Sequence, residues 1–342
     1  MINIAIFGAG GLGKSMARLA SIKKEFRVVC ILDSNGYAFN SSGIDYNLIE
    51  NSVDTVANIP EIGIKTNQAI DEVLEKYSDK INGIFMALPN LPNSFIPDVT
   101  EKVAESNFKG VIVDALKRTT AVEMLSKLDK KLEKNGILYI TGAGATPGML
   151  SAVAAIAAQS YVDIKEITIT FGVGISNWEQ YRATIKEDIA HLEGFNPEIV
   201  SKMTEAEIEE ELEKRNGILE LVNMEHADDV ILELAGVCSR DKVSVGGIVD
   251  TRNAKKPLST NVKITGVTLE GKTGTHTFTL SDETTMSDNV NGPALGYMLA
   301  AHYLHKRNIS GFMTSADIGP KFPETDQEKL HKLFKSKELV MA

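Results

Sequence analysis

The stretch INIAIFGAGGLGKS, residues 2–15, decides the fold of this chain. Its apolar run, Ile2–Phe7, predicts a buried strand, and the residues after the glycines predict a helix. Between the two stand Gly8, Gly10 and Gly13 in the order G-x-G-x-x-G. In a dinucleotide-binding loop the first glycine permits a tight turn, the second lets the backbone approach a pyrophosphate, and the third lets helix and strand pack closely. The pattern therefore predicts a strand, loop and helix that bind a dinucleotide.

The same glycines allow a second interpretation, because residues 8–15 also spell G-x-x-x-x-G-K-S, the P-loop pattern. In a P-loop ATPase, residues 111–114 would be a strand followed by the acid that helps to hold Mg²⁺. A purely structural glycine turn is a third interpretation. Asp33 favours the dinucleotide, because a P-loop gives this residue no role.

Asp33 follows the second apolar run, 27–32, and lies about twenty residues after Gly13. A carboxylate at this point accepts hydrogen bonds from ribose hydroxyls in dinucleotide-binding folds. It also repels a 2′-phosphate, and residues 34–40 contain no Arg or Lys to bind one. The sequence therefore favours NAD, while NADP stays open because Lys14 could reach a phosphate. The predicted cofactor-binding residues are Gly8, Gly10, Gly11, Leu12, Gly13, Asp33, Leu88, Pro89, Asn90, Asp114 and Ala115.

Apolar runs and helical segments alternate over the first 145 residues, which predicts an α/β fold of the Rossmann type, with a doubly wound parallel sheet. After about Ser160 the runs are longer and rich in Thr and Val, and they predict a second, α+β domain on a mostly antiparallel sheet. Residues 293–306 predict an alanine-rich return helix. We expect a dinucleotide-binding domain of residues 1–148 plus 288–342, and a substrate and oligomerisation domain of residues 149–287.

The composition argues against nucleic-acid-binding, membrane-spanning and zinc-binding proteins. The 342 residues carry 36 basic and 46 acidic side chains, a net charge of −10, so a nucleic-acid partner is not expected. The longest apolar stretch, residues 149–158, is too short to cross a bilayer, and no signal peptide is visible, so we expect a cytoplasmic protein without membrane contact. Cys30 and Cys238 form neither a disulfide framework nor a zinc motif, and no metal is predicted.

A homo-oligomer is also expected. The strands predicted in residues 243–280 have no obvious covering helix, and an open sheet of this kind leaves one face uncovered. A two-fold dimer would be the simplest way to cover it. The expected partners are therefore a small-molecule substrate and a second copy of the chain.

Several segments resemble a known family. Residues 85–90 and 111–114 end strands where many dehydrogenases present loops to their cofactor, and Pro147-Gly148 resembles a turn of saccharopine and diaminopimelate dehydrogenases. The likeness to saccharopine dehydrogenase-like NAD(P)-dependent oxidoreductases covers about residues 2–195 and 284–320. It implies hydride transfer to or from a carbonyl or imine carbon of a small polar metabolite, with Pro147 and Gly148 beside the substrate.

Basic residues stand where those families carry acids that hold an ammonium group. Lys117 and Arg118 follow the strand at 111–114, which favours a carboxylate-bearing substrate. Lys117 also resembles, by position, a lysine of the glucose–fructose oxidoreductase and inositol dehydrogenase family. Beside Arg118 its amine could have a lowered pKa and act as general acid or base. A solvated surface pair is the alternative.

A helix predicted over residues 178–192 supplies the other catalytic candidates. Asp188 and His191 are three residues apart on it and hence neighbours, so the acid could orient the imidazole as a proton donor. We expect Lys117, Asp188 and His191 to meet between the domains as catalytic residues. The predicted substrate-binding residues are Trp178, Arg182, Arg252, Pro147 and Gly148.

Two further interpretations remain at this stage. A dinucleotide-binding sensor without catalytic activity would show the same glycine loop, because the fold alone does not establish the function. The run Glu225-His226-Ala-Asp228-Asp229 contains metal-ligand residue types without the spacing of a metal site. Helix capping or surface charge is the expectation for that run.

Overall fold

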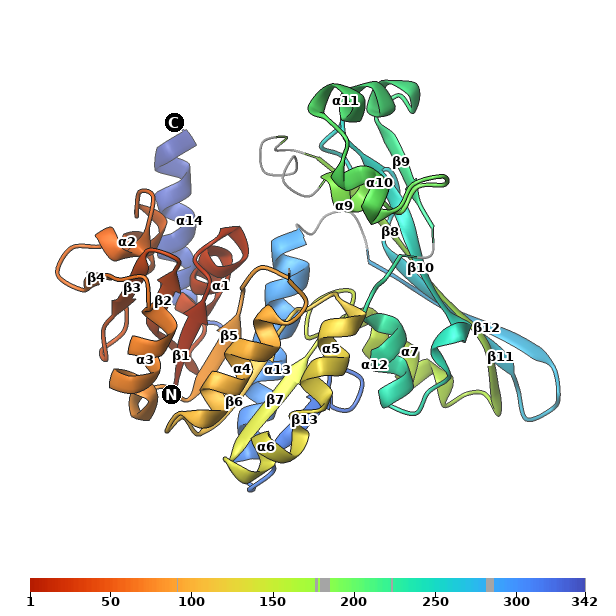
Figure 1. Cartoon of the computed structure of the whole chain (residues 1–342). Coiled ribbons are helices and arrows are strands. Elements are labelled where there is room, and N and C mark those ends of the chain that lie inside the picture. The colour runs from red at the N-terminus through yellow and green to blue at the C-terminus, as the bar shows by residue number, and fades with distance from the viewer. Residues whose placement is uncertain (91, 176–177, 179–184, 223, 281–285, 342) are drawn as a thin grey trace. The chain divides into compact units, whose positions relative to one another are not determined.

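The computed structural model describes residues 1–90, 92–175, 178, 185–222, 224–280 and 286–341 (Figure 1). The polypeptide divides into two compact units. The first unit consists of Met1–Ala152 and Met286–Ala342, and the second of Val153–Thr285. In the described part of the sequence, no helix is both long enough and apolar enough to cross a bilayer.

The first unit is built on one eight-stranded sheet, in the order β13-β7-β6-β5-β1-β2-β3-β4. All neighbouring pairs from β13 to β2 are parallel, and β3 and β4 add an antiparallel edge. The strands are β1 (Ile2–Phe7), β2 (Phe26–Asp33), β3 (Gly36–Phe39), β4 (Gly63–Lys65), β5 (Gly83–Met86), β6 (Gly110–Asp114), β7 (Ile137–Thr141) and β13 (Gly311–Thr314). The Rossmann-type prediction is confirmed, with strand order reversing on either side of β1.

Helices cover both faces of this sheet (Figure 1). One face is covered by α1 and α13, which pack together and bury Met16, Ala17, Leu295 and Met298 against the strands. The helical segments of the unit are α1 (Gly11–Ser21), α2 (Tyr46–Glu50), η1 (Val56–Asn58), α3 (Ala69–Tyr77), η2 (Ser78–Lys80), α4 (Phe95–Glu105), α5 (Thr119–Ser126), α6 (Asp129–Lys134), α13 (Met286–His305) and α14 (Gln327–Met341), and α7 (Met149–Ala158) leads into the second unit. The apolar strands are buried because helices lie on both sides.

Helix α13 begins seven residues before the predicted start at Pro293. Proline is typical of a first helical turn, because it has no N–H to donate. Here the helix runs through it, and two side chains of the preceding turn are buried, with Asn289 8% and Asn291 0% exposed. Packing of this turn into the unit therefore outweighs the local preference for a helix start at the proline.

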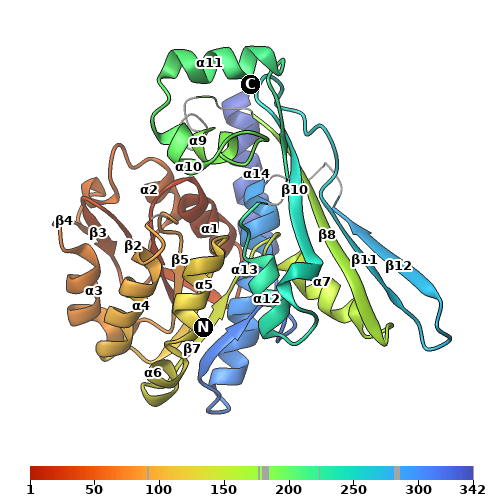
Figure 2. The same ribbon diagram turned by 45° about the vertical axis from the view of Figure 1, so that its right-hand side comes forward.

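The second unit has a five-stranded sheet, in the order β12-β11-β8-β10-β9 (Figure 2). Only β8 and β10 pair in parallel, so the mostly antiparallel prediction is confirmed. The strands are β8 (Asp163–Gly174), β9 (Ile218–Leu221), β10 (Val243–Asp250), β11 (Asn261–Val267) and β12 (Thr273–Thr279). The helical segments are α9 (Ile185–Ile189), α10 (Pro197–Ser201), α11 (Glu205–Lys214), α12 (Asp228–Leu234) and η3 (Arg240–Lys242).

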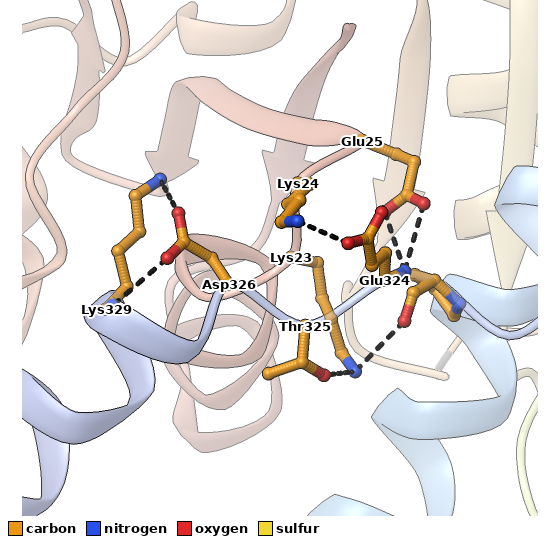
Figure 3. Close-up of polar contacts among 8 residues, drawn as sticks. Lys23, Lys24, Glu25, Glu324, Thr325, Asp326 and Lys329 are labelled. Carbon is orange, nitrogen blue, oxygen red and sulfur yellow. Dashed lines mark hydrogen bonds and ion pairs between the residues drawn. The ribbon is translucent and has the colours of Figure 1, made fainter.

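The tail before α14 is bound to the turn between α1 and β2 (Figure 3). The Lys23 amine donates to Thr325 Oγ1 at 2.7 Å and to the Pro323 carbonyl at 3.3 Å. Burial lowers the pKa of Lys23, and the nearby charge of Glu25 opposes this shift. The Glu25 carboxylate accepts a bond from the Glu324 amide, and Lys24 forms an ion pair with the Glu324 side chain. The C-terminal segment is thus held by a buried amine and not only by surface charges.

Replacing Thr325 with Val should reduce the free energy of unfolding by about 1–3 kcal/mol, because the buried Lys23 amine loses its side-chain acceptor. Urea denaturation at neutral pH measures the change. Lys24→Met is the matched control, since its ion pair with Glu324 is 51% and 64% exposed and solvent screens it, so this substitution should change the free energy of unfolding much less. Equal effects of the two substitutions would contradict the proposed importance of the buried contact.

Candidate functional site

The glycine loop joins β1 to α1 at the point where the strand order reverses. Gly8 has a φ of +111°, and a Cβ on it would lie 2.2 Å from the Ala87 carbonyl oxygen at the end of β5. A Cβ on Gly13 would lie 1.8 Å from the Gly8 carbonyl oxygen. Neither position can accept a side chain, so the two glycines hold β1, β5 and α1 in close contact.

The outer side of the same loop is open. A Cβ built on Gly10 or on Gly11 meets no atom within 4 Å. Gly10 is the N-cap of α1, and within the described structure the helix has no side-chain cap there. The first N–H groups of α1 therefore have no side-chain acceptor, and the bare backbone lets an anion approach them. These residues fit the pyrophosphate of a dinucleotide.

The Asp33 carboxylate at the end of β2 has a fixed orientation. It accepts bonds from the Asn35 amide at 2.8 Å, the Thr55 hydroxyl at 2.8 Å and the Val56 amide at 2.9 Å. The side chain is half-buried. Asn35, Thr55 and Val56 were not singled out in the sequence, since no local pattern connects residue 33 to residues 55 and 56. The role of Asp33 at a ribose stays a prediction.

Asp114, at the end of β6, is fully buried and bonded within the protein. It accepts bonds from the Leu116 and Gly142 amides, at 3.0 and 2.7 Å, and from the Tyr139 and Thr141 hydroxyls, at 2.7 and 3.0 Å. Burial raises the pKa of the Asp114 carboxyl, and these donors oppose the shift. The carboxylate joins the ends of β6 and β7, so it is engaged by protein donors and not presented to a cofactor or to Mg²⁺.

The loop after Asp114 carries the predicted catalytic lysine. Ala115, Lys117 and Arg118 are half-buried in this loop, which leads into α5. The bond from the Leu116 amide to Asp114 fixes the start of the loop. Asp114 therefore fixes the backbone of the loop from which the Lys117 side chain extends.

The Pro147-Gly148 turn lies at the same sheet edge. Gly148 has a φ of +136°, and a Cβ on it would lie 1.9 Å from the Gly144 carbonyl oxygen. A Cβ on Gly144 would be 3.3 Å from Ala115 Cβ and 3.4 Å from Val290 Cγ1. The turn is thus packed between the loop after β6 and the start of α13. Leu88, Pro89 and Asn90 follow β5 at this edge and are at most half-buried.

Asn291 lies in α13 and contacts the glycine loop. Its side-chain amide donates to the Leu12 carbonyl at 3.2 Å, so it holds the glycine loop from behind. Its side chain is 0% exposed, and its Oδ1 atom has no hydrogen-bond partner within the described residues. A buried acceptor without a donor is costly, and a ligand N–H or O–H could satisfy it.

The remaining predicted residues belong to the second unit. Trp178 packs against the apolar cluster formed by Ile185, Ile189 and Leu192. The predicted helix over 178–192 is shorter where the structure describes it: α9 ends at Ile189, and His191 lies in the following turn, its amide bonded to the Asp188 carbonyl. Arg182 lies outside the described residues. The predicted meeting of Lys117 with Asp188 and His191 stays a prediction.

Arg252 is engaged by neighbouring residues of the second unit. Its guanidinium bonds to Asn216 Oδ1 at 2.6 Å and to Glu213 Oε1 at 2.6 Å. This pairing follows from the path of the backbone after α11, which the sequence did not reveal. A role for Arg252 as a carboxylate clamp would require this ion pair to open.

His226 and Asp228 differ from the surface residues that were expected. Both side chains are buried, at 7% and 0% exposure, and His226 Nδ1 lies 2.7 Å from Asp228 Oδ2. His226 also lines a pocket with Met224, Ser244 and three acidic residues. Asp228 and Asp229 lie in the first turn of α12, in keeping with a place at a helix start. The alternative of surface charge is wrong for His226 and Asp228, because both side chains are buried.

Comparison with known proteins agrees with this architecture. Residues 3–88 match the family model of the PglD N-terminal domain. Among solved structures, the DAP dehydrogenase of C. glutamicum in complex with DAP superposes with a TM-score of 0.58 at 17% identity, over 96% of this chain and 98% of the other. Apo saccharopine dehydrogenase (L-Glu forming) of Saccharomyces cerevisiae gives 0.55 at 10% identity, over 92% and 94%. The resemblance to these dehydrogenases is thereby confirmed for the fold.

A sequence relative shows the family. The (S)-8-amino-7-oxononanoate synthase BioU of Haloferax mediterranei is 40% identical over 354 residues, which cover 94% of this chain and 99% of the relative. The chain therefore belongs to the BioU family.

Proposed function

We propose that this protein is an NAD(P)-dependent oxidoreductase of the BioU family, acting on a ketone or imine carbon along the route to or from 8-amino-7-oxononanoate. The observation that carries this proposal is the glycine loop at the strand-order reversal. It combines closed packing at Gly8 and Gly13 with an open, uncapped helix start at Gly10 and Gly11. This combination suits a pyrophosphate.

The compound in the relative's name fits the chemistry expected from the sequence. By its name, 8-amino-7-oxononanoate carries a ketone, a neighbouring amine and a remote carboxylate. The carbonyl or imine carbon and the carboxylate are the two features that the resemblance and the basic residues Lys117 and Arg118 predict. The amine was not predicted, because the acids that bind an ammonium group in the resembled families are absent from this loop.

In such a reaction, some residues of the first unit would bind the cofactor and others would act on the substrate. The first turn of α1 would bind the pyrophosphate, and Asp33 would accept bonds from the ribose. The nicotinamide, when bound, supplies or accepts a hydride at its C4 atom. Lys117 would hold or donate a proton at the substrate oxygen or nitrogen, and Arg118 would bind a carboxylate.

Asn291 would complete the cofactor site from the side of α13. Its Oδ1 acceptor is buried and has no partner within the described residues, while its amide group already holds Leu12. A donor on the ligand would satisfy it.

The P-loop interpretation gains no support from Asp114, whose carboxylate is engaged by four protein groups.

Gly10→Ala should leave the fold intact and weaken dinucleotide binding at least tenfold. Gly10 has φ −71° and ψ −171°, which alanine adopts readily, and its Cβ would meet no atom of the protein. The methyl group would instead occupy the space where the pyrophosphate approaches the backbone. Fluorescence titration with NADH and NADPH measures the two dissociation constants. NADH should bind more tightly than NADPH, because the Asp33 carboxylate repels a 2′-phosphate.

Gly319→Ala is the matched control, because Gly319 also has no neighbour within 4 Å of its Cβ position and is not part of the loop. Its NADH affinity should equal that of the unmodified protein. Tight binding of Mg-ATP without any dinucleotide affinity would overturn the proposal. Binding of NADH without turnover of 8-amino-7-oxononanoate or its imine would indicate a sensor.

Lys117→Met should lower turnover by about 10²- to 10⁴-fold, the usual contribution of a positioned proton donor. The dissociation constant of NADH should change less than twofold, because the lysine would act on the substrate. Lys127→Met, an exposed lysine directly after α5, is the control and should retain full activity.

A lysine amine can also form an imine with a ketone. Borohydride treatment in the presence of 8-amino-7-oxononanoate, followed by mass analysis of the Lys117 peptide, separates imine formation from proton transfer. Unchanged turnover in Lys117→Met would remove this residue from the mechanism.

A further inference from the structure

The Asp33 carboxylate, which the proposed function assigns to the ribose of a dinucleotide, is already bonded to groups of its own chain. Its Oδ1 atom accepts a bond from the Asn35 amide at 2.8 Å, and its Oδ2 atom accepts one from the Val56 amide at 2.9 Å. The Thr55 hydroxyl lies 2.8 Å from both oxygens. Within the described residues, these three groups are the donors to the carboxylate.

The Thr55 hydroxyl lies at the open end of this carboxylate. Its equal distances place it midway between the two oxygens, and its single proton is shared between them. An ionised carboxylate offers about four acceptor sites. The amides of Asn35 and Val56 fill one site on each oxygen, and the Thr55 hydroxyl covers the remaining two. Two neighbouring ribose hydroxyls would need these same two sites.

Thr55 is held in this place by a short helix that is anchored in the core. It is the N-cap of η1, and its Oγ1 atom accepts a bond from the Ala57 amide at 3.1 Å. The next residue, Val56, is 0% exposed and packs in the apolar core of the first unit. Because Val56 anchors η1, the Thr55 hydroxyl can turn away from Asp33 while the helix stays in the core.

We propose that the Thr55 hydroxyl is an internal competitor of the ribose, which displaces it from Asp33 when the dinucleotide binds. This inference rests on the proposed function, because it takes the dinucleotide as the ligand. The incoming 2′-hydroxyl donates to Asp33 in place of Thr55, so one hydrogen bond to the carboxylate is exchanged for another. Asp33 therefore orients the ribose but adds little net affinity while Thr55 is present.

The first test uses the unmodified full-length protein. The 2′-deoxyadenosine analogue of NADH lacks the hydroxyl that would replace Thr55. In fluorescence titrations it should bind within threefold of NADH, because only an exchange of similar bonds is lost. A carboxylate with free acceptor sites would instead favour NADH about tenfold or more, and that result would overturn the proposal.

Thr55→Ala removes the competitor and clears the space in front of the carboxylate. Thr55 has φ −152° and ψ 147°, which alanine adopts readily, and the buried Val56 keeps η1 in place. NADH should bind this variant at least threefold more tightly than the unmodified protein, and the 2′-deoxy analogue should show no gain. Equal or weaker binding of NADH would contradict the proposed competition, as would an equal gain for the analogue.

Thr66→Ala is the matched control for the loss of a threonine hydroxyl. Thr66 Oγ1 also donates to a carboxylate, that of Glu72 at 2.6 Å, and accepts a bond from the amide two residues on, that of Gln68 at 3.1 Å. Both alanine variants should unfold at a lower urea concentration, but only Thr55→Ala should gain NADH affinity. A merely structural role of Thr55 would lower stability and affinity together. Thr55→Ser keeps the hydroxyl and should restore the affinity of the unmodified protein.

The same titrations separate this inference from the proposed function. Absence of NADH binding in both the unmodified protein and Thr55→Ala would refute the proposed function. Binding of NADH to the unmodified protein without any gain in Thr55→Ala would leave the proposed function standing and refute the competition. If Thr55→Ala fails to fold, the comparison of NADH with its 2′-deoxy analogue on the unmodified protein still decides.

Discussion

The contact between Gly13 and the Gly8 carbonyl oxygen determines how β1, β5 and α1 meet in the first unit. A Cβ on Gly13 would lie 1.8 Å from that oxygen, and a Cβ on Gly8 would lie 2.2 Å from the Ala87 carbonyl oxygen. Only hydrogen fits at both places, so β1, β5 and α1 meet at backbone distance. The first turn of α1 therefore starts at the reversal of strand order, where ligands bind in folds of this type.

Two buried polar side chains, Asp114 and Asn291, hold the loops next to this contact in place. Asp114 joins the ends of β6 and β7 and fixes the start of the loop that carries Lys117. Asn291 connects α13 to Leu12 in the glycine loop. Buried hydrogen bonds of this kind specify one arrangement, because leaving any of their groups unpaired is costly. The position of Lys117 thus depends on Asp114, a residue first interpreted as a cofactor contact.

Local patterns in the sequence were sufficient for the fold. The glycine spacing predicted the strand, loop and helix, which the structure confirms as β1 and α1. The errors arise where distant segments meet. Pro293 marked a false helix start, and the His226–Asp228 pair is buried and not at the surface. In each case packing from elsewhere in the protein decides the outcome, and neither spacing nor propensity contains that information.

The two units carry side chains of opposite charge at the places described above. In the first unit, the loop after β6 presents Lys117 and Arg118, and its single acid, Asp114, is engaged inside the protein. In the second unit, the pocket at His226 is lined by acids and this imidazole without any Lys or Arg. An amino-oxo acid carries an anionic carboxylate, a polar carbonyl and a cationic amine. Under the proposed function, the basic loop after β6 would bind the carboxylate and carbonyl of such a molecule, and its amine would need acceptors that this loop does not contain.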